Sequence, residues 1–404
     1  MENSERIKVL TSLLNDFHRK VKVKWASTDE YKIKGKEWLQ SIHEKYDDLI
    51  LDNWAQDTLL TETFHFLEIS NKSQAENKQS DLILIMKGGG IKGLSYVGAL
   101  EELQKYYDFN WFSGTSAGAI TAVLLAAGYT NSELKVILEE KNFSDFKDAS
   151  LLKALINLKN KGGLYEANTF TSWLEHLLSK KLDSATEIKL SHLPYRITIC
   201  ASRKNKSALL FDSTDEEYRN KNAAFATRCS MSIPIIFTPQ KEEGLNIFDG
   251  GLQNNFPVEV ILKRNPNADF IGLYLGPEIY ETPKNSILKD PFSIWMDSSE
   301  AEILETYKDK IVVIDTRPIS TLKFKLNKNE KDFLLENGRL AALKFLDKKG
   351  LIDKNQFNYE ERKDALTTEK ERLVNKKKRI RRLVKTTLIT LAILTTGLYY
   401  FDYF

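Results

Sequence analysis

The chain has 404 residues, of which 42% are hydrophobic and 28% charged, a composition close to that of ordinary globular proteins. Its two cysteines, Cys200 and Cys229, form no C-x-x-C pair, which argues against a disulfide framework or a thiolate zinc site and favours a reducing compartment. The formal net charge of +3 hides an asymmetry, because seven basic residues and no acidic residue lie between Lys376 and Lys385, which leaves the rest of the chain net acidic.

The first 80 residues are predicted to form a helical region that ends in a linker. Apolar residues recur at helical spacing in two stripes, Leu10, Leu13, Leu14 and Phe17, and then Leu59, Leu60, Phe64 and Leu67. The polar stretch from Asn71 to Ser80 is typical of a linker. The residues at the N-terminus lack the apolar run of a signal peptide.

Strands that alternate with helices are predicted from about residue 81 to residue 320. Leu82–Met86 is a continuous apolar run of strand length, which is typical of a strand buried on both faces of a parallel sheet. A helical pattern follows through Leu100 and Leu103. Further strands are expected around Trp111-Phe112 and over Tyr195–Cys200, Ala208–Phe211, Asp269–Leu275 and Lys310–Asp315. This alternation predicts an α/β fold in which helices cover both faces of a central, mostly parallel sheet.

The pentapeptide from Gly114 to Gly118 has the pattern G-x-S-x-G around Ser116. Small neighbours permit a sharp strand-to-helix turn that exposes the serine hydroxyl at a helix N-terminus, where a developing oxyanion is favoured. A turn without any chemistry is the alternative. No histidine follows His192, so the order serine, acid, histidine of an α/β-hydrolase is excluded.

A glycine-rich loop, Gly88 to Gly93, follows the first strand of this region. Such a loop leaves backbone N–H groups free to point into a pocket. Its spacing also fits the dinucleotide fingerprint G-x-G-x-x-G, with Asp108 about twenty residues further on near the ribose-binding position. A nucleotide-binding or scaffold protein that does not hydrolyse its ligand is therefore the alternative function. A P-loop is excluded, because Leu94 follows Gly93.

Two further segments complete the pattern. Asp249-Gly250-Gly251 follows a short apolar stretch, which places the aspartate at the end of a strand, and Asn254, Asn255 and Pro257 come shortly after it. Residues 226–239 combine small residues with two prolines, and they predict a helix that ends in an extended buried connection. Each segment alone is typical of an ordinary turn or connection.

Taken together and in this order, the four motifs resemble the patatin-like phospholipase family over roughly residues 81–275. The resemblance implies that Ser116 is the nucleophile and that Asp249 is its only partner. It implies oxyanion donors in the glycine loop, at Gly88, Gly89 and Gly90. The remaining motif positions are Lys92, the basic residue of the loop, together with Gly93, Gly114, Gly118, Gly250 and Gly251.

A Ser–Asp dyad explains why no histidine is needed. The function implied is hydrolysis of acyl esters in phospholipids or related lipids, in the manner of a phospholipase A, with no cofactor and no metal. The five histidines are expected to be surface or satisfied core residues; they are His18, His43, His65, His176 and His192.

A charged helical region is predicted over residues 321–382, followed by an apolar tail over residues 383–404. The sixteen residues Thr386–Phe401 carry no charge and would span about 24 Å as a helix, against about 30 Å for a bilayer core. With Leu383 and Val384 included, we expect a single-pass tail anchor that leaves the catalytic domain in the cytoplasm. A helix lying flat in the interface and a buried terminal helix are the alternatives.

The basic segment from Lys376 to Lys385 adjoins this tail, which favours anionic lipid over nucleic acid as its partner. The residues leave the lipid head group, the acyl position and the oligomeric state open.

Overall fold

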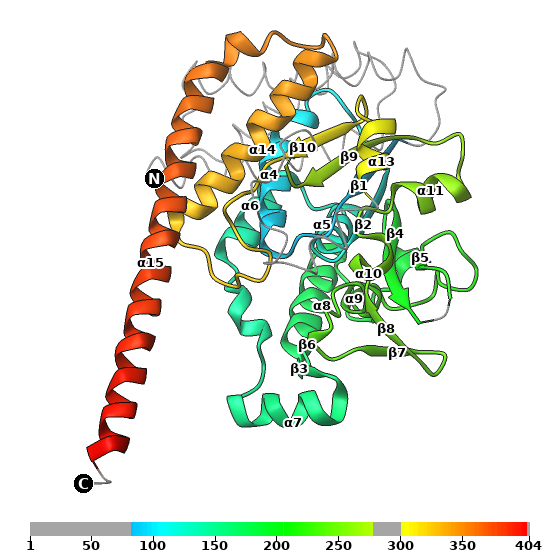
Figure 1. The fold of residues 1–404 in the computed structure, drawn as a ribbon. Helices are drawn as coiled ribbons and strands as arrows, with labels where there is room; N and C mark the ends of the chain where they lie inside the picture. Colours follow the sequence, from blue (N-terminus) through cyan, green and yellow to red (C-terminus); the bar gives the residue numbers. More distant parts are fainter. Residues whose placement is uncertain (1–81, 205, 278–299, 402–404) are drawn as a thin grey trace, which may run out of the picture. The chain divides into compact units, whose positions relative to one another are not determined.

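A mixed sheet of eight strands forms the centre of the part of the chain that the structure describes (Figure 1). The structure is a computed structural model, and it describes residues 82–204, 206–277 and 300–401. The N-terminal helices and the linker predicted over residues 1–80 lie outside the described residues. The elements discussed below belong to one unit, which comprises Asp81–Leu103 and Phe109–Phe404.

The strand order is β10-β9-β1-β2-β4-β8-β7, with β5 also paired to β4. Strands β10, β9, β1, β2 and β4 run parallel, whereas β5 and β8 run antiparallel to β4, and β7 runs antiparallel to β8. The bounds of the strands are β1 Leu82–Met86, β2 Trp111–Thr115, β4 Arg196–Arg203, β5 Leu209–Asp212, β7 Gln240–Glu242, β8 Leu245–Asp249, β9 Asp269–Leu275 and β10 Ile311–Ile314. The expected α/β fold with a mostly parallel sheet is therefore confirmed.

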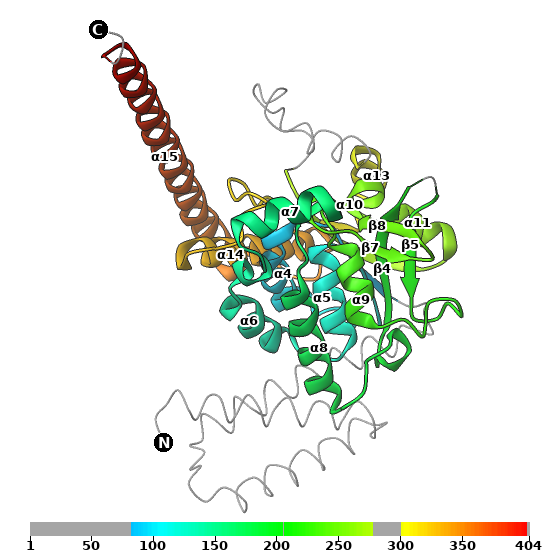
Figure 2. The same ribbon diagram turned by 90° about the horizontal axis from the view of Figure 1, so that it is seen from below.

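Helices cover both faces of the sheet. Their bounds are α4 Leu94–Leu103, α5 Ala117–Ala126, α6 Asn131–Glu140, α7 Leu151–Lys161, α8 Asn168–Leu182, α9 Ala223–Ser230, α10 Gly251–Asn254, α11 Val258–Arg264, α13 Ala301–Thr306, α14 Lys328–Lys348 and α15 Tyr359–Phe401. Short 3-10 helices are η1 Gly90–Gly93, η2 Phe143–Phe146, η3 Leu190–His192 and η4 Lys354–Phe357. Figure 2 shows α4 and α14 on the opposite side of the sheet from α11 and α13.

The first strand shows why the sheet is buried on both faces. Ile83, Leu84, Ile85 and Met86 are all 0% exposed, as the uninterrupted apolar run predicts. Ile83 and Ile85 join a core cluster with residues of α11 and α13. Successive side chains of a strand alternate between its faces, so Leu84 and Met86 face the other helical layer.

A small second sheet joins β3 (Gly163–Tyr165) to β6 (Ile235–Phe237). Neither strand was predicted, because three residues are too few to show a period. Residues 226–239 do contain the expected helix, α9. The expectation of a buried connection after it is wrong at Ile235, whose side chain is 63% exposed, while Phe237 is 2% exposed.

Helix α14 packs along α4 at very short range. A Cβ atom on Gly98 of α4 would collide with the backbone carbonyl of Leu335, and one on Gly338 of α14 would collide with the carbonyl of Ser95. Two glycines facing each other's backbones therefore let the helices approach closely, and Leu334 and Leu343 of α14 are completely buried.

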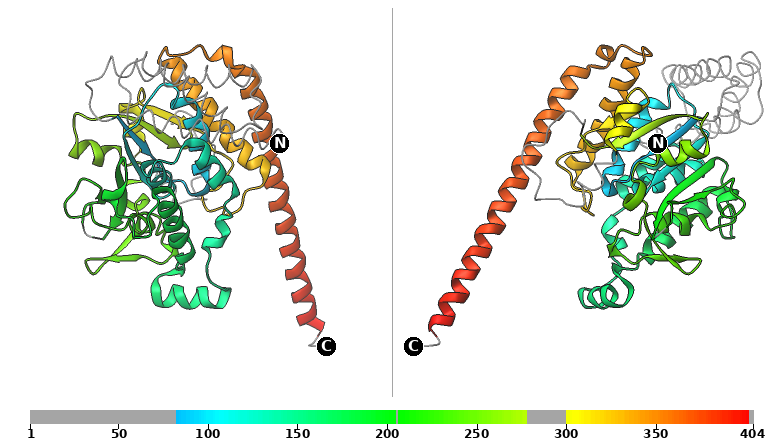
Figure 3. Two further views of the ribbon diagram at one scale, coloured as in Figure 1. Left: turned by 180° about the vertical axis from the view of Figure 1, so that it is seen from behind. Right: turned by 45° about the vertical axis from the view of Figure 1, so that its right-hand side comes forward.

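Helix α15 is one continuous helix of 43 residues (Figure 3). Its first turns pack on α14 through Tyr359, which clusters with Leu340 and Leu343. Further along, Lys370 pairs with Asp315 at 2.7 Å and Lys377 donates a hydrogen bond to the Pro318 carbonyl at 3.2 Å. Among the residues that the structure describes, we find no helix that combines the length and the apolarity needed to cross a membrane.

The contact between α4 and α14 gives a stability prediction. Gly98→Ala should lower the free energy of unfolding by about 2 kcal/mol, because the gain in helix propensity of about 1 kcal/mol is smaller than the cost of forcing a methyl group against a backbone carbonyl. Urea denaturation of the full chain measures the change. Asp332→Ala, at an exposed position of α14, is the control and should change stability by less than about 0.5 kcal/mol. A Gly98→Ala protein more stable than the parent would contradict this account of the contact.

Candidate active site

The topology brings Ser116 and Asp249 together at one edge of β4. Ala201 of β4 pairs with Leu209 of β5 and also with Asp249 of β8, so β5 and β8 lie on opposite edges of β4. The edge of β4 that pairs with β8 also pairs with β2, through Thr115 of β2 and Cys200 of β4. Strands β2 and β8 therefore approach each other end to end, and their last residues pair with neighbouring positions of β4. The loops that follow both strands start at the same point.

Ser116 occupies a strained turn between β2 and α5. Its backbone angles are φ 52° and ψ −116°, a region that residues other than glycine rarely adopt, and its side chain is 6% exposed. The two flanking glycines are required by space. A Cβ on Gly114 would collide with the backbone of Gly118, and a Cβ on Gly118 would collide with the carbonyl of Met86. The predicted elbow is therefore present, and its sequence pattern has a steric cause.

A buried serine holds the backbone of the elbow in place. Ser230, the last residue of α9, accepts a hydrogen bond from the Ser116 amide at 2.9 Å and donates one to the Cys200 carbonyl at 2.6 Å. Ser230 is fully buried. The segment 226–239 contains Ser230, but the sequence pattern indicates no role for it, because its partner Ser116 lies 114 positions away.

The glycine loop lies beside the elbow. A Cβ on Gly88 would lie 3.4 Å from the Ser116 Cβ, an ordinary contact distance, and 2.3 Å from Oδ1 of Asn255, which would have to move. The Gly88 amide, however, donates to the Asn255 carbonyl at 2.9 Å. Its assignment as an oxyanion donor is therefore corrected, because the N–H group is already engaged.

Gly89 and Gly90 keep the features expected of donors. Among the described residues, no acceptor is found for either amide. Gly90 has a φ of 57°, and a Cβ there would collide with the carbonyl of Thr321. Gly93 and Lys92 shape the loop: the Lys92 amide donates to the Gly89 carbonyl at 3.3 Å, and a Cβ on Gly93 would lie 3.1 Å from that of Ala117.

Asp249 is a buried carboxylate, with 6% of its side chain exposed. Oδ1 accepts a hydrogen bond from the Gly251 amide at 2.7 Å, whereas Oδ2 has no hydrogen-bond partner of ordinary geometry among the described residues. Burial raises the pKa of Asp249 from 3.8 to about 6, although the Ser116 hydroxyl and the Gly251 amide both favour the charged form.

Gly250 is needed for close approach of the two strand ends. A Cβ on Gly250 would collide with the carbonyl of Cys200 and would lie 2.9 Å from Cγ2 of Thr115. The Asp249 amide donates to the Ser232 carbonyl at 2.9 Å, which ties the aspartate to the connection after α9. The D-G-G motif therefore has a packing role, which is to allow close contact between backbones.

A buried ion pair involves the residue that directly precedes the glycine loop, and the sequence did not predict it. Lys87 pairs with Glu300, and the two side chains are 5% and 3% exposed. The Lys87 ammonium also lies 4.0 Å from the centre of the Tyr274 ring, and Tyr96 donates a hydrogen bond to the Lys87 carbonyl. The partners are 213 positions apart, so the sequence contains no local signal for this contact.

The two described histidines lie outside this constellation. His176 on α8 and His192 on η3 are both exposed, and the Nδ1 of His192 accepts a hydrogen bond from the Lys189 amide at 3.4 Å. His18, His43 and His65 lie outside the described residues.

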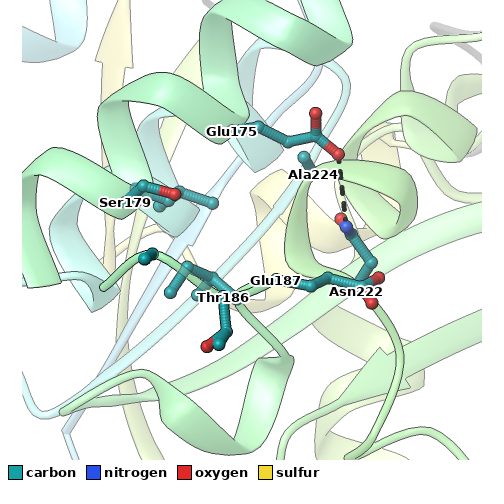
Figure 4. A pocket seen from close by; sticks show the side chains of 9 residues that line it. Glu175, Ser179, Thr186, Glu187, Asn222 and Ala224 are labelled. Carbon is teal, nitrogen blue, oxygen red and sulfur yellow. Dashed lines mark hydrogen bonds between the residues drawn. The ribbon is translucent and has the colours of Figure 1, made fainter.

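A separate hollow of about 280 Å³ lies between α8 and the start of α9 (Figure 4). Across it, Asn222 donates a hydrogen bond to Glu175 at 3.3 Å. It is lined by Glu175, Leu178, Ser179, Ala185, Thr186, Glu187, Ile188, Asn222 and Ala224, none of which belongs to the predicted dyad or its loop.

Comparison with known proteins places this constellation in a family. The family model described as "Patatin-like phospholipase" matches residues 84–262. The uncharacterized protein YqhO of Bacillus subtilis is 29% identical over 286 residues, which cover 65% of this chain and 97% of YqhO.

Some of the relatives have names that refer to lipids. The probable lipid hydrolase 463L of Invertebrate iridescent virus 6 is 28% identical over 45% of this chain and 63% of its own. A cGAMP-activated phospholipase of Pseudomonas aeruginosa is 26% identical over 43% of this chain and 54% of its own. Among solved structures, VipD of Legionella pneumophila aligns with a TM-score of 0.43 and 18% identity over 67% of each chain.

The family match covers most of β1, the elbow, β4 and the D-G-G motif, which are the elements that build the site. Residues 84–262 of this chain are therefore a patatin-like phospholipase domain.

Proposed function

We propose that this protein is a lipid acyl hydrolase of the phospholipase A type, in which Ser116 and Asp249 act as a catalytic dyad. The observation that carries the proposal is the end-to-end meeting of β2 and β8, which places a strained serine beside a buried carboxylate. The family match and the relatives named as lipid hydrolases support the choice of substrate class.

In the first step, Oγ of Ser116 attacks the carbonyl carbon of an acyl ester while Oδ2 of Asp249 accepts the serine proton. The amides of Gly89 and Gly90 donate hydrogen bonds to the developing oxyanion. One such donor typically lowers the barrier by about 3–4 kcal/mol, so two can offset much of the weakness of a carboxylate as a base. Collapse of the tetrahedral intermediate expels the lysolipid alcohol, which takes the proton back from Asp249.

In the second step, water hydrolyses the acyl-enzyme. Asp249 accepts a proton from the water as it attacks the Ser116 ester, and the fatty acid leaves as Ser116 recovers its proton. A carboxylate with an ordinary pKa of about 4 would be a poor base at neutral pH. Burial that raises the pKa to about 6 makes Asp249 a better match to the task.

The nucleotide-binding alternative explains the G-x-G-x-x-G spacing alone. Here the same glycines have a steric role beside the elbow, since Gly88 approaches Ser116 and Gly93 approaches Ala117. The hydrolase therefore explains more of the observed geometry.

Substitution of the dyad tests the reaction. Ser116→Ala and Asp249→Asn should each reduce fatty-acid release from phospholipid vesicles by at least about 1000-fold, because nucleophile and base act as one unit. Ser207→Ala, at an exposed serine, is the matched control and should retain full activity. A fluorophosphonate probe should label the parent and Ser207→Ala but not Ser116→Ala. Undiminished release by a folded Ser116→Ala protein would refute the mechanism.

The raised pKa of Asp249 predicts the pH profile. With a soluble short-chain ester, kcat/KM should rise with pH through a midpoint of about 6, because the base must be ionised. A midpoint near 4, the ordinary value for a carboxyl group, would contradict the role of burial.

The same group should affect stability in the opposite sense. The native state binds more protons at Asp249 than the unfolded state does between the two pKa values, so its contribution is present at low pH and is lost as pH rises from about 4 to about 6. Urea titrations across this range should show a smaller loss in Asp249→Asn than in the parent.

We further propose that residues 383–404 anchor the protein in a membrane, with the catalytic domain in the cytoplasm. Support comes from the sixteen uncharged residues Thr386–Phe401, which directly follow seven cations, and from the continuity of α15 up to Phe401. Such a tail would hold the site close to its lipid substrate.

Truncation tests this anchor. A chain that ends at Arg382 should move from the membrane pellet to the supernatant, whereas the full chain should resist an alkaline carbonate wash. Extraction of the full chain by carbonate would indicate a helix lying in the interface and would contradict a spanning anchor. Protease accessibility of the catalytic domain in intact cells and in lysed cells reports its orientation.

A further inference from the structure

We propose that helix α7, together with Ile235, forms a docking surface that inserts into the interface of an anionic lipid bilayer. We call the surface the α7 patch and define it as Leu151, Leu152, Leu155, Ile156 and Ile235. The proposal rests on the proposed function only for the identity of the substrate. The docking itself depends on the geometry and charge of the patch.

Helix α7 carries its large apolar side chains on the outside. Leu151, Leu152, Leu155 and Ile156 are 80%, 72%, 55% and 52% exposed. At 3.6 residues per turn, these four positions span an arc of about 140° on one side of the helix. A helix that packs on a core has the reverse arrangement, with its apolar face inward.

The inner side of α7 is small and polar. Ala154 and Asn157 are 1% and 4% exposed, and they lie opposite the apolar arc. The Asn157 amide donates a hydrogen bond to the Leu164 carbonyl at 3.4 Å. The protein therefore packs against the small, polar side of α7. The larger, apolar side stays exposed and is available to another surface.

Ile235 adds a further exposed apolar side chain near the end of the helix. It is 63% exposed, and it pairs with Gly163, two residues after α7 ends (Figure 1). Its φ of 71° is unfavourable for a β-branched residue. A strained backbone thus presents a large aliphatic side chain to the surroundings, which packing alone does not explain.

Charge selects a lipid surface as the occupant. Helix α7 contains Lys153, Lys159 and Lys161 and no acidic residue. Lys153 and Lys161 reach Glu166 at 3.9 and 2.9 Å, and their side chains are 59% and 48% exposed. Exposed pairs of this kind are weak, so phosphate groups can replace the carboxylate. Exposed aliphatic residues with lysines around them are typical of helices that lie in the plane of a bilayer interface.

A chain of hydrogen bonds connects the segment that follows α7 to the proposed catalytic aspartate. Arg228, which is 2% exposed, donates to the Glu166 carbonyl at 2.7 Å, just after the β3 strand that follows α7. It also donates to the Ser232 hydroxyl at 2.7 Å and to the Thr238 carbonyl at 2.9 Å, just after β6. The Ser232 carbonyl in turn accepts the Asp249 amide. A bilayer that binds α7 would therefore lie against the same rigid assembly that positions the base.

A fluorophore placed on α7 tests the docking directly. Cys200 and Cys229 are the only cysteines of the chain and both are buried, and burial raises the pKa of both thiols, so a new exposed cysteine can be labelled selectively. The full chain with Ser116→Ala and Leu155→Cys is labelled with an environment-sensitive dye and mixed with vesicles of phosphatidylcholine and phosphatidylglycerol. The Ser116→Ala background keeps the vesicles intact.

We expect a blue shift of the emission and quenching by spin-labelled lipid. The matched control is Val136→Cys on α6, an aliphatic position with 52% exposure, which should show neither effect. Because the dye reports its own surroundings, binding of the C-terminal tail cannot imitate the signal. An unshifted emission at position 155 would overturn the proposal. So would a shift that appears without lipid and depends on protein concentration, because it would identify a second copy as the occupant.

Hydrolysis separates this proposal from the proposed function. Leu152→Glu combined with Leu155→Glu should reduce fatty-acid release from anionic vesicles by about tenfold or more and leave hydrolysis of a soluble ester unchanged. Val136→Glu should leave both unchanged. Release from vesicles at the parent rate by the double variant would overturn the docking surface. If the parent releases no fatty acid while the label at position 155 still shifts, the proposed function fails and the docking surface stands.

Discussion

The site depends on one constraint, which is that β2 and β8 share an edge of β4 and run toward each other. The backbones of both following turns are tightly packed where these ends meet. Gly250 lets the turn after β8 approach β4, because a Cβ there would collide with the Cys200 carbonyl, whereas Gly114 and Gly118 let the elbow fold closely on itself and against Met86 of β1. Ser230 then fixes the result by bridging the Ser116 amide and the Cys200 carbonyl. The geometry of the candidate site therefore follows from close packing of the backbone.

In the mechanism that we propose, burial of Asp249 takes over part of what a histidine does in serine hydrolases that have one. A histidine titrates near neutral pH without special surroundings, whereas a carboxylate does so only when its charged form is destabilised. Asp249 is buried, its Oδ1 accepts a hydrogen bond from the Gly251 amide, and within the described part of the chain its Oδ2 has no hydrogen-bond partner of ordinary geometry. Because the charged form of Asp249 is incompletely solvated, its pKa rises, and a carboxylate with a raised pKa is a stronger base.

The surroundings of the proposed dyad also bear on how the domain would reach a substrate that lies in a bilayer. The large side chains of α7 point outward, and the α7 patch is linked through Arg228 and Ser232 to Asp249. In the scheme that we propose, the C-terminal tail sets which membrane the protein is near, and the α7 patch sets how the domain rests on it. These two tasks use different physical means, a long apolar segment for the first and a short amphipathic helix for the second.

The sequence by itself determined the α/β class, most strands of the sheet and the candidates Ser116 and Asp249. Those features are local: an uninterrupted apolar run such as Leu82–Met86 specifies a doubly buried strand, and small residues around a serine specify a sharp turn. Only the tertiary structure decided that Gly88 is not a free donor, because its acceptor, Asn255, lies far along the chain. The same holds for Ser230, for the Lys87–Glu300 pair and for the outward face of α7. Each of these features depends on which distant segments of the chain the fold brings together, and the local sequence pattern does not show this.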